Sequence, residues 1–344
     1  MPKTQTSYVP LTICRFQRRL RNYMVTNILG RHCHLPSSIL HAVRQQVTRG
    51  KLVRPTTSFL VAKMLGTTKR EKTMMPCLAA LELVHRSTLI HDDIADRAEE
   101  RNGIPCIHVT HGLATALYVA NLIQNLGISL CPSSMRDSLN DVILDLYRGQ
   151  LGESIVHAEG IFRERMFHDY ENIAWLKSGN LGEFAILMGA YLADDTPPRN
   201  SHQLARSLGL AYQMCNDLEE FHRWLSCNDP QIVIPDVRNR TRTLPMLLLW
   251  QTCRSNFLKK YLASRPGDSI PRNVRLLATQ HDPRSKVASM IRKILEEASN
   301  VLALWPDNTY RVRFSRLALR VWPQLYAGAA GDLISVASKR SAKP

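Results

Sequence analysis

The sequence Leu89-Ile90-His91-Asp92-Asp93-Ile94-Ala95-Asp96 places three carboxylates at the end of an apolar stretch. On a helix with about 100° between successive residues, Asp92 and Asp96 project within about 40° of each other, whereas Asp93 lies about 100° away from Asp92. Three acids this close repel one another unless a cation lies between them, and such hard oxygen ligands suit Mg²⁺. The stretch alone leaves two interpretations open, a magnesium site and an exposed acidic helix end.

A second acidic group, Asn216-Asp217-Leu218-Glu219-Glu220, has the same form. Asn216, Asp217 and Glu220 repeat the spacing of the first group, and each group ends an apolar helical segment. Two such groups in one chain are far less expected by chance than one. The simplest geometry places two helices opposite each other across a cavity, each offering oxygen ligands to metal ions between them.

Apolar residues recur at helical spacing along most of the chain, and we find no alternating β pattern of convincing length. The spacing predicts helices over residues 11–30, 39–47, 59–65, 72–96, 113–130, 135–159, 171–193, 202–220, 246–262, 284–304 and 310–338. The chain has 344 residues and is 44% hydrophobic, which is sufficient for a large core. We therefore predict an all-α fold, with residues 1–344 forming a single domain.

The chain is strongly basic, with a net charge of +16, which suits nucleic acid, an anionic membrane surface or a polyanionic small substrate. Aromatic residues make up only 7% of the sequence, and it contains neither zinc-finger spacing nor the regular Gly/aromatic motif of an RNA-binding sheet. No apolar run approaches the roughly eighteen residues that a transmembrane helix needs. We therefore expect a small polyanionic substrate, no nucleic-acid partner and no transmembrane segment.

Eight cysteines occur without CxxC pairs, and most lie in apolar surroundings, as expected for reduced thiols of a cytosolic protein. No Asp or Glu precedes Glu71, whereas Lys and Arg are frequent there. A basic, acid-free start is also typical of an organelle transit peptide, but residues 15–48 fit the first helices of the fold better. We expect a cytoplasmic protein and keep organelle targeting as the alternative.

Basic residues accompany both acidic groups. Lys51 and Arg54 lie three residues apart at the start of a predicted helix, where the macrodipole disfavours cations and a nearby anion would explain them. His85 lies seven residues before Asp92 on the same helix face. Lys177 stands beside two small residues within a helix, which indicates a close ligand or a kinked backbone. Further cations follow each group, namely Arg97 and Arg101 after the first and Arg238, Arg240 and Arg242 after the second.

Carboxylates for Mg²⁺ with Lys and Arg nearby are what a diphosphate needs, because metal ions bridge its oxygens and cations neutralise the rest. An apolar cavity behind the metals would hold a hydrocarbon tail. Departure of the diphosphate would leave an allylic carbocation that a neighbouring alkene can attack. The lack of a Gly-rich phosphate loop argues against kinase-type chemistry, and no Ser/His/Asp triad or nucleophilic Cys is evident.

Together these motifs resemble the trans-isoprenyl diphosphate synthases of the polyprenyl synthetase family, of the geranylgeranyl and farnesyl diphosphate synthase type. The matching motifs run in the family's order over residues 50–245: Gly50–Pro55 (GKxxRP), Asp92–Asp96 (first aspartate-rich motif), Arg101–Gly103 (RRG), Gly149-Gln150 (GQ), Lys177–Gly179 (KTG), Gly209–Glu220 (GxxxQ and the second aspartate-rich motif) and Asp236–Pro245 (DLxxGKxTLP). The resemblance implies a homodimer and an isoprenoid synthase fold, a bundle of long helices around a deep central cavity.

The resemblance also implies residue roles. Six residues would bind three Mg²⁺ ions and the allylic diphosphate, namely Asp92, Asp93, Asp96, Asn216, Asp217 and Glu220. Isopentenyl diphosphate would be held by Lys51, Arg54 and His85. The catalytic candidates are Arg101 and Lys177, which would contact the allylic diphosphate, and Gln213, which would lie near the reacting centre. Arg240 flanks Thr241, the position of a family lysine, and is a further substrate-binding candidate.

The sequence departs from the family pattern at several positions. Asn102 replaces an arginine that usually binds isopentenyl diphosphate, and Thr241 replaces a lysine. Asn216 and Glu219-Glu220 replace aspartates of the second motif, although they remain oxygen donors. The Gly-Lys expected near Pro230-Gln231 is absent. These departures weaken contacts to diphosphate and leave more than one function open.

Three functions remain. The first is a chain-elongating prenyltransferase, which the retained Lys51, Arg54 and His85 support. Ser87 and Thr88 would leave the cavity floor open, because bulky aromatics there would stop a growing chain early, so the product would be C20 or longer. The second is a terpene synthase that ionises a prenyl diphosphate without isopentenyl diphosphate, which Asn102 supports. The third is a non-catalytic subunit, against which two nearly complete acidic groups argue.

Overall fold

The computed structural model describes residues 9–32, 35–101, 103–158, 166–227, 235–264 and 272–335. Every regular element within these ranges is a helix, and their one extended pairing is an isolated bridge between Glu100 and Pro105. The prediction of an all-α fold is therefore confirmed. The chain divides into two compact units, which we describe one at a time, and the single domain stays a prediction.

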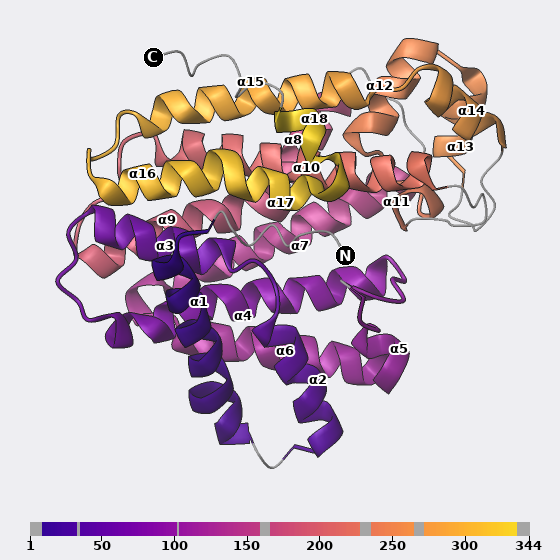
Figure 1. Cartoon of the computed structure of the whole chain (residues 1–344). Helices are drawn as coiled ribbons and strands as arrows, with labels where there is room; N and C mark the ends of the chain where they lie inside the picture. The colour runs from indigo at the N-terminus through magenta and orange to yellow at the C-terminus, as the bar shows by residue number, and fades with distance from the viewer. Residues whose placement is uncertain are drawn as a thin grey trace. The chain divides into compact units, whose positions relative to one another are not determined.

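The first unit comprises residues 1–144, 183–201 and 305–317. Its elements are α1 (Leu11–Tyr23), η2 (Met24–Ile28), η3 (Leu29–His32), α2 (Ser37–Thr48), α3 (Val53–Met64), α4 (Glu71–Ala95), α5 (Ile107–His111), α6 (Leu113–Leu130), η4 (Ser133–Met135), the start of α7 (Arg136–Ala158), most of α9 (Asn180–Ala193) and α16 (Thr309–Arg316). The central helix is α4, which runs beside α6 (Figure 1). Its end carries the first acidic group.

Close packing against α6 fixes the rotation of α4. Gly127 of α6 lies on α4, since a Cβ at this position would come within 2.9 Å of Val84 Cγ2 and 3.0 Å of the Ala80 carbonyl. Further along, the side chains of His91 and Asn121 form a hydrogen bond between the same two helices. The residues of this contact face lie about 80–120° from Asp92 on an ideal helix. The packing therefore turns Asp92 away from α6.

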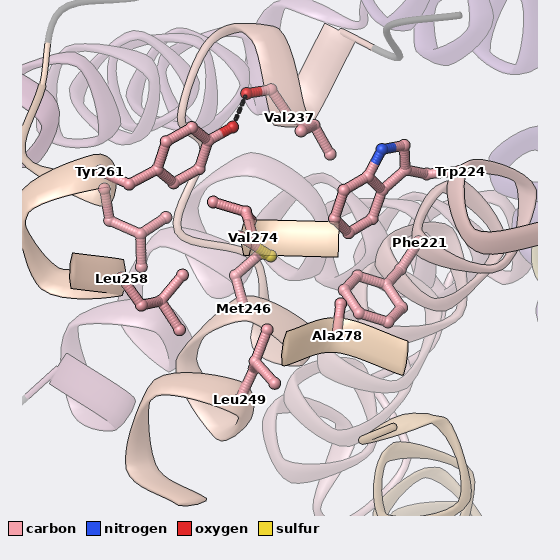
Figure 2. Close-up of a cluster of buried hydrophobic side chains, with 10 residues drawn as sticks. Phe221, Trp224, Val237, Met246, Leu249, Leu258, Tyr261, Val274 and Ala278 are labelled. Carbon is pink, nitrogen blue, oxygen red and sulfur yellow. Dashed lines mark hydrogen bonds between the residues drawn. The ribbon is translucent and has the colours of Figure 1, made fainter. Parts of the chain in front are cut away.

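The second unit comprises residues 145–182, 202–304 and 318–344. Its elements are the rest of α7, α8 (Met166–Ala174), η5 (Trp175–Gly179), α10 (Ser201–Ser226), α11 (Pro235–Arg238), α12 (Leu244–Cys253), α13 (Asn256–Leu262), α14 (Arg272–Gln280), α15 (Arg284–Leu302), η6 (Leu317–Val321), α17 (Trp322–Ala327), η7 (Gly328–Ala330) and α18 (Gly331–Ser335). A buried cluster joins the end of α10 to α12, α13 and α14 through Phe221, Trp224, Met246, Leu258 and Val274 (Figure 2). This cluster anchors the helix that carries the second acidic group.

Two glycines bring α10 against η5 in the second unit. A Cβ on Gly209 would lie 2.4 Å from the Gly179 Cα, so the two backbones touch. The segment Trp175–Gly179 is a π-helix, which confirms the irregular backbone predicted around Lys177. The predicted helix over residues 171–193 is therefore interrupted by η5.

Seven predicted helices occur as single helices, most with shifted ends, and four divide, among them 11–30 into α1, η2 and η3 and 171–193 into α8, η5 and α9. The predicted helix 72–96 is α4 and the helix 113–130 is α6, with the same ends in the second case. The predicted helix 246–262 divides into α12 and α13, because Arg254 adopts φ +48° and ends α12. The predicted helix 310–338 divides into α16, η6, α17, η7 and α18 as far as residue 335.

The helix α6 goes against the expectation that no apolar run approaches the length of a membrane span. It has 18 residues with a mean hydropathy of 1.3, which meets the length and composition of such a span, and 33% of it is buried within the structure. This is weak evidence for a membrane segment, since core helices of globular proteins meet the same criteria.

Candidate active site

The first acidic group separates into buried and accessible carboxylates. Asp93 is only 2% exposed, and its Oδ1 accepts a hydrogen bond from Arg101 Nε at 2.6 Å. The Cys106 thiol also bonds to Asp93, and burial together with the Asp93 charge raises the pKa of Cys106 to about 12. Asp92 and Asp96 are partly exposed. Asp92 and Asp96 are thus the accessible members, while Asp93 is engaged by the protein.

The turn after α4 returns Arg101 to the acidic group. The Ala98 amide donates to the Asp93 carbonyl at 2.9 Å, and the Cys106 amide donates to the Glu99 carbonyl at 2.9 Å. Within this turn the Arg101 amide donates to the Ile104 carbonyl at 2.8 Å. Asn102, the departure that supports a terpene synthase, lies outside the described residues.

Cationic side chains lie near His85, which precedes Asp92 by about two helical turns. Withdrawal from water, followed by the charges of Arg54, Arg86, Arg101 and Lys51, holds the pKa of His85 well below 6.5. The imidazole is therefore neutral at pH 7. The predicted ligands of isopentenyl diphosphate thus lie close enough to influence one another.

Arg54 contributes an orphaned donor to this cluster. Its Nε is buried and has no hydrogen-bond partner among the described residues. Buried polar groups in proteins are almost always hydrogen-bonded, so an orphaned donor of this kind needs an explanation. A phosphate oxygen would satisfy the guanidinium and offset the surrounding positive charge.

Ser87 and Thr88, the predicted chain-length residues, differ in exposure. Ser87 is fully buried, and its hydroxyl donates to the Val84 carbonyl at 2.8 Å. Thr88 is partly exposed, and its hydroxyl donates to the His85 carbonyl at 2.8 Å. Thr88 is thus the more accessible of the two.

The second acidic group repeats the division of the first. Asp217 is 3% exposed and accepts three hydrogen bonds, from Gln213 Nε2 at 2.9 Å, the Tyr170 hydroxyl at 2.8 Å and the Leu244 amide at 3.0 Å. Burial raises the pKa of Asp217 to about 6, although all three bonds oppose the shift. Asn216 is exposed and Glu220 partly exposed, so these two are the accessible members.

Lys177 lies in η5 and pairs with a carboxylate that the sequence did not assign. Its Nζ donates to Glu153 Oε2 at 2.6 Å, and the two side chains are 21% and 23% exposed. Gly149 permits this approach, since a Cβ there would lie 3.0 Å from Lys177 Cγ. Glu153 was present in the motif stretch, but its pairing is a long-range contact with no local signal.

Gln213 is held at both ends of its amide. Ser178 donates from its hydroxyl to Gln213 Oε1 at 3.3 Å, while Gln213 Nε2 donates to Asp217. The motif residues Lys177, Gln213 and Asp217 are therefore brought together within the second unit. Their orientation depends on the contact between Gly209 and Gly179 described above.

Arg240, a predicted substrate-binding residue, is used by the fold. It is 5% exposed, and its Nη1 donates to the Val237 carbonyl at 3.0 Å and to the Tyr261 hydroxyl at 2.7 Å. Its guanidinium also lies 4.1 Å from the centre of the Tyr261 ring. Tyr261 in turn donates to Val237, the bond drawn in Figure 2. Binding of substrate by Arg240 would require it to leave these partners, and its substrate role stays a prediction.

The accessible oxygen donors suit Mg²⁺ bound together with a substrate. No three acidic, histidine or cysteine side chains among the described residues are grouped for a single ion. Mg²⁺ keeps several waters and commonly takes only one or two protein carboxylates besides substrate phosphates, so Asp92 with Asp96 is a fitting donor set. The two acidic groups belong to different units, and their facing each other across a cavity stays a prediction.

Comparison with known proteins gives one family. The polyprenyl synthetase family model matches residues 36–273. The chain is 28% identical to geranylfarnesyl diphosphate synthase from Aeropyrum pernix over 293 residues, covering 79% of this chain and 88% of that enzyme. It is 25% identical to nonaprenyl diphosphate synthase from Mycobacterium tuberculosis over 300 residues, covering 84% and 86%. With geranylgeranyl diphosphate synthase from Sulfolobus acidocaldarius it shares 24% identity, over 60% of this chain and 65% of that enzyme.

Solved structures agree on the fold. Geranylgeranyl pyrophosphate synthase from Lactobacillus brevis aligns with a TM-score of 0.76 at 22% identity, covering 91% of this chain and 97% of that one. Heptaprenyl diphosphate synthase from Staphylococcus aureus aligns with a TM-score of 0.73 at 20% identity, covering 92% and 99%. At these identities the likeness shows the all-α fold.

Proposed function

The chain belongs to the polyprenyl synthetase family and is a trans-prenyltransferase, and we propose that it condenses isopentenyl diphosphate with an allylic diphosphate, in a Mg²⁺-dependent reaction, to a product of C20 or longer. The observation that carries this proposal is the cationic cluster around His85 with the orphaned Arg54 Nε. An enzyme that only ionises one allylic diphosphate at an acidic group has no need of this cluster. A second diphosphate explains it.

The two kinds of subsite differ in charge. Lys51, Arg54 and His85 present positive or neutral donors with no carboxylate in the predicted set, which suits direct contact with the diphosphate of isopentenyl diphosphate. Asp92 and Asp96 present carboxylates, which suit an allylic diphosphate only when cations lie between. The two substrates would therefore be distinguished by how each diphosphate is held.

For the allylic substrate, Mg²⁺ would be held by Asp92 and Asp96 and, in the second unit, by Asn216 and Glu220. When bound, the metal supplies charge that stabilises the departing diphosphate. Asp93 and Asp217 would support the metal ligands rather than contact the metal, since both are buried and hydrogen-bonded by the protein. They would hold the backbone from which the accessible donors project.

The bond changes are those of an ionisation followed by an addition. The allylic C–O bond breaks, and the diphosphate leaves with the electron pair. The alkene of isopentenyl diphosphate attacks the carbocation, and the new cation loses a proton to the released diphosphate. Arg101 and Lys177 would bind the developing negative charge, while Gln213, fixed by Ser178 and Asp217, would line the reacting centre.

We also propose that the enzyme is a homodimer. Val109, Leu113, Leu117 and Tyr118 on α5 and α6 are 52%, 55%, 39% and 76% exposed. Leu113 and Leu117 lie four residues apart on α6 and so share one face of that helix, and exposed apolar patches of this kind mark interaction surfaces. Light scattering after size exclusion should give twice the chain mass, and Leu113→Glu with Leu117→Glu should give the single chain mass.

A product assay tests the function. The purified protein is incubated with Mg²⁺ and allylic diphosphates of increasing length, with and without isopentenyl diphosphate. Longer diphosphates formed only with isopentenyl diphosphate support elongation. Hydrocarbons or alcohols formed without it would overturn elongation in favour of a terpene synthase. No turnover in either case would favour the non-catalytic subunit.

A further inference from the structure

The turn formed by Gly50, Lys51 and Leu52 before α3 has a backbone that needs support. Gly50 has φ +86° and Leu52 has φ +49°. Leu52 is buried at the start of α3, with no side-chain cap. A leucine in the left-handed region is unfavourable and persists only where its surroundings hold it. The contacts around this turn therefore identify what holds it.

One support is a buried ion pair of α4. The guanidinium of Arg86 packs directly against Gly50, since a Cβ at this glycine would lie 1.7 Å from Arg86 Nη2. Arg86 Nε donates to Glu82 Oε1 at 2.7 Å, and Nη2 bonds to the same oxygen. The two side chains are only 5% and 1% exposed. Arg86 is thus a buried cation whose guanidinium packs against the turn at Gly50.

The other support comes from α1. Arg21 donates from Nη2 to the Gly50 carbonyl at 2.9 Å. Gln17 donates from Nε2 to the Lys51 carbonyl and to Thr56 Oγ1, both at 3.1 Å. The second bond ties the turn to the first residues of α3. Two side chains of α1 therefore hold consecutive carbonyls of the turn.

Stability alone does not account for the buried pair. Replacing a buried ion pair with apolar groups of similar size is often neutral or stabilising, because the desolvation cost of two charges offsets their attraction. The pair lies instead under the turn that carries Lys51 and precedes Arg54. Its position fits a role in fixing conformation.

We propose that the Glu82–Arg86 pair, with Gln17 and Arg21, holds the turn in the conformation that presents Lys51 and Arg54 to the diphosphate of isopentenyl diphosphate. Arg86 is then a positioning residue, since it acts through the turn. This inference rests on the proposed function, which assigns the turn to that substrate. It adds Arg86, an unusual cation in an apolar helix, to the residues that determine affinity for one substrate only.

The test compares three variants with the wild-type chain. Glu82→Leu/Arg86→Met removes both buried charges together, so that neither is left unpaired. Gln17→Leu removes one of the two α1 supports, leaving the Arg21 bond to Gly50, and does not alter a buried charge. Arg19→Met/Glu71→Leu is the matched control, because this pair also joins α1 to α4 but lies at the surface, with Arg19 54% exposed and a 2.6 Å contact.

Three readouts separate positioning from general stability. Amide hydrogen exchange over residues 50–56 should rise in the first two variants and stay unchanged in the control. The KM for isopentenyl diphosphate should rise about tenfold, while the KM for the allylic diphosphate changes less than about twofold. Binding of inorganic pyrophosphate, measured by calorimetry without Mg²⁺, should weaken by a similar factor.

Each result decides the inference. Unchanged exchange over residues 50–56 in both variants overturns it, whatever the activity. An equal rise of both KM values also overturns it, because that indicates a general defect. If Glu82→Leu/Arg86→Met does not fold, Gln17→Leu decides alone. If the wild-type enzyme extends no allylic diphosphate, the proposed function fails, and the pyrophosphate titration still supports the inference by weakened binding or overturns it by unchanged binding.

Discussion

The two acidic groups have the same spacing and the same division between buried and accessible members, but different partners hold the buried member. Asp93 of α4 pairs with the cation Arg101. The donors to Asp217 of α10 within the described part of the chain are all neutral, with Tyr170 among them. Burial consequently raises the pKa of Asp217 to about 6. The same sequence pattern is thus stabilised by charge in one unit and by neutral hydrogen bonds in the other, which predicts different responses to substitution.

The largest effect should come from an accessible carboxylate. Asp92→Ala should lower kcat by about a thousandfold or more, because a metal ligand is lost, while the free energy of unfolding changes by less than about 0.5 kcal/mol. Steady-state kinetics and urea denaturation measure the two quantities. The exposed neighbour Glu99→Ala serves as the control and should leave both unchanged. Normal turnover of Asp92→Ala would refute the metal-site assignment.

Removal of the cation should destabilise the first group. Arg101→Met leaves the Asp93 carboxylate buried without its charged partner and should lower the free energy of unfolding by about 2 kcal/mol. This value allows for Arg101 being 33% exposed. Urea denaturation measures it, and the comparison with Arg148→Met, whose pair with Asp145 is exposed, supplies the control. A loss no greater than in that control would show that charge does not hold this group.

Burial of His85, followed by the cations around it, also predicts an acid sensitivity. The pKa of His85 lies well below 6.5 in the fold, so as pH falls below 6.5 the unfolded chain takes up a proton before the folded chain does. The free energy of unfolding should then fall by up to about 1.4 kcal/mol per pH unit from this residue. His85→Gln should remove that slope, and the exposed His41→Gln should keep it. Equal slopes for His85→Gln and the wild type would contradict the assignment.

Loss of one neutral donor should have a smaller effect on the second group. Tyr170→Phe leaves Asp217 with the Gln213 and Leu244 donors and should cost about 1 kcal/mol of unfolding free energy. Tyr191→Phe, at a more exposed tyrosine, is the matched control. If Tyr170→Phe destabilised the chain as much as Arg101→Met, the distinction between charged and neutral support would not hold.

The predicted chain-length residues Ser87 and Thr88 also differ in burial. Thr88→Phe should shorten the product with little change in turnover, because this side chain is partly exposed and a larger one can be accommodated there. Ser87→Phe should mainly destabilise the fold, since overpacking a filled position costs about 1–3 kcal/mol. Product analysis and thermal unfolding distinguish these outcomes. Unchanged product length in Thr88→Phe would exclude this residue from setting chain length.

Local pattern sufficed for the helices and for part of the site. Helical periodicity gave α4 and α6 nearly to the residue, and 100° spacing separated Asp93 from Asp92 and Asp96. The same spacing leaves undecided which acid is buried, because that depends on Arg101 and Cys106 folding back onto α4. Exposure depends on neighbours distant in sequence, which a periodicity does not contain.

Contacts between residues distant in sequence could not be predicted either, because helical periodicity carries no information about them. The sequence predicts Arg240 as a substrate ligand, whereas in the structure its side chain donates hydrogen bonds to Val237 and Tyr261. The pairing of Lys177 with Glu153 spans 24 residues and had no local indication. Glycines are the clearest sequence indication of such contacts, since Gly149 and Gly50 each lie where a distant side chain packs against the backbone.

The contact between Gly179 and Gly209 has a consequence for how this enzyme can evolve. A methyl group on Gly209 would overlap the Gly179 backbone, and one on Gly179 would lie 2.5 Å from the Trp175 ring. A larger residue at position 209 would therefore separate η5 from α10, the segments that carry Lys177 and Gln213, whereas one at position 179 would displace the Trp175 ring within η5. Side chains around the reacting centre can thus be exchanged more freely than Gly209, which sets the distance between these two backbones.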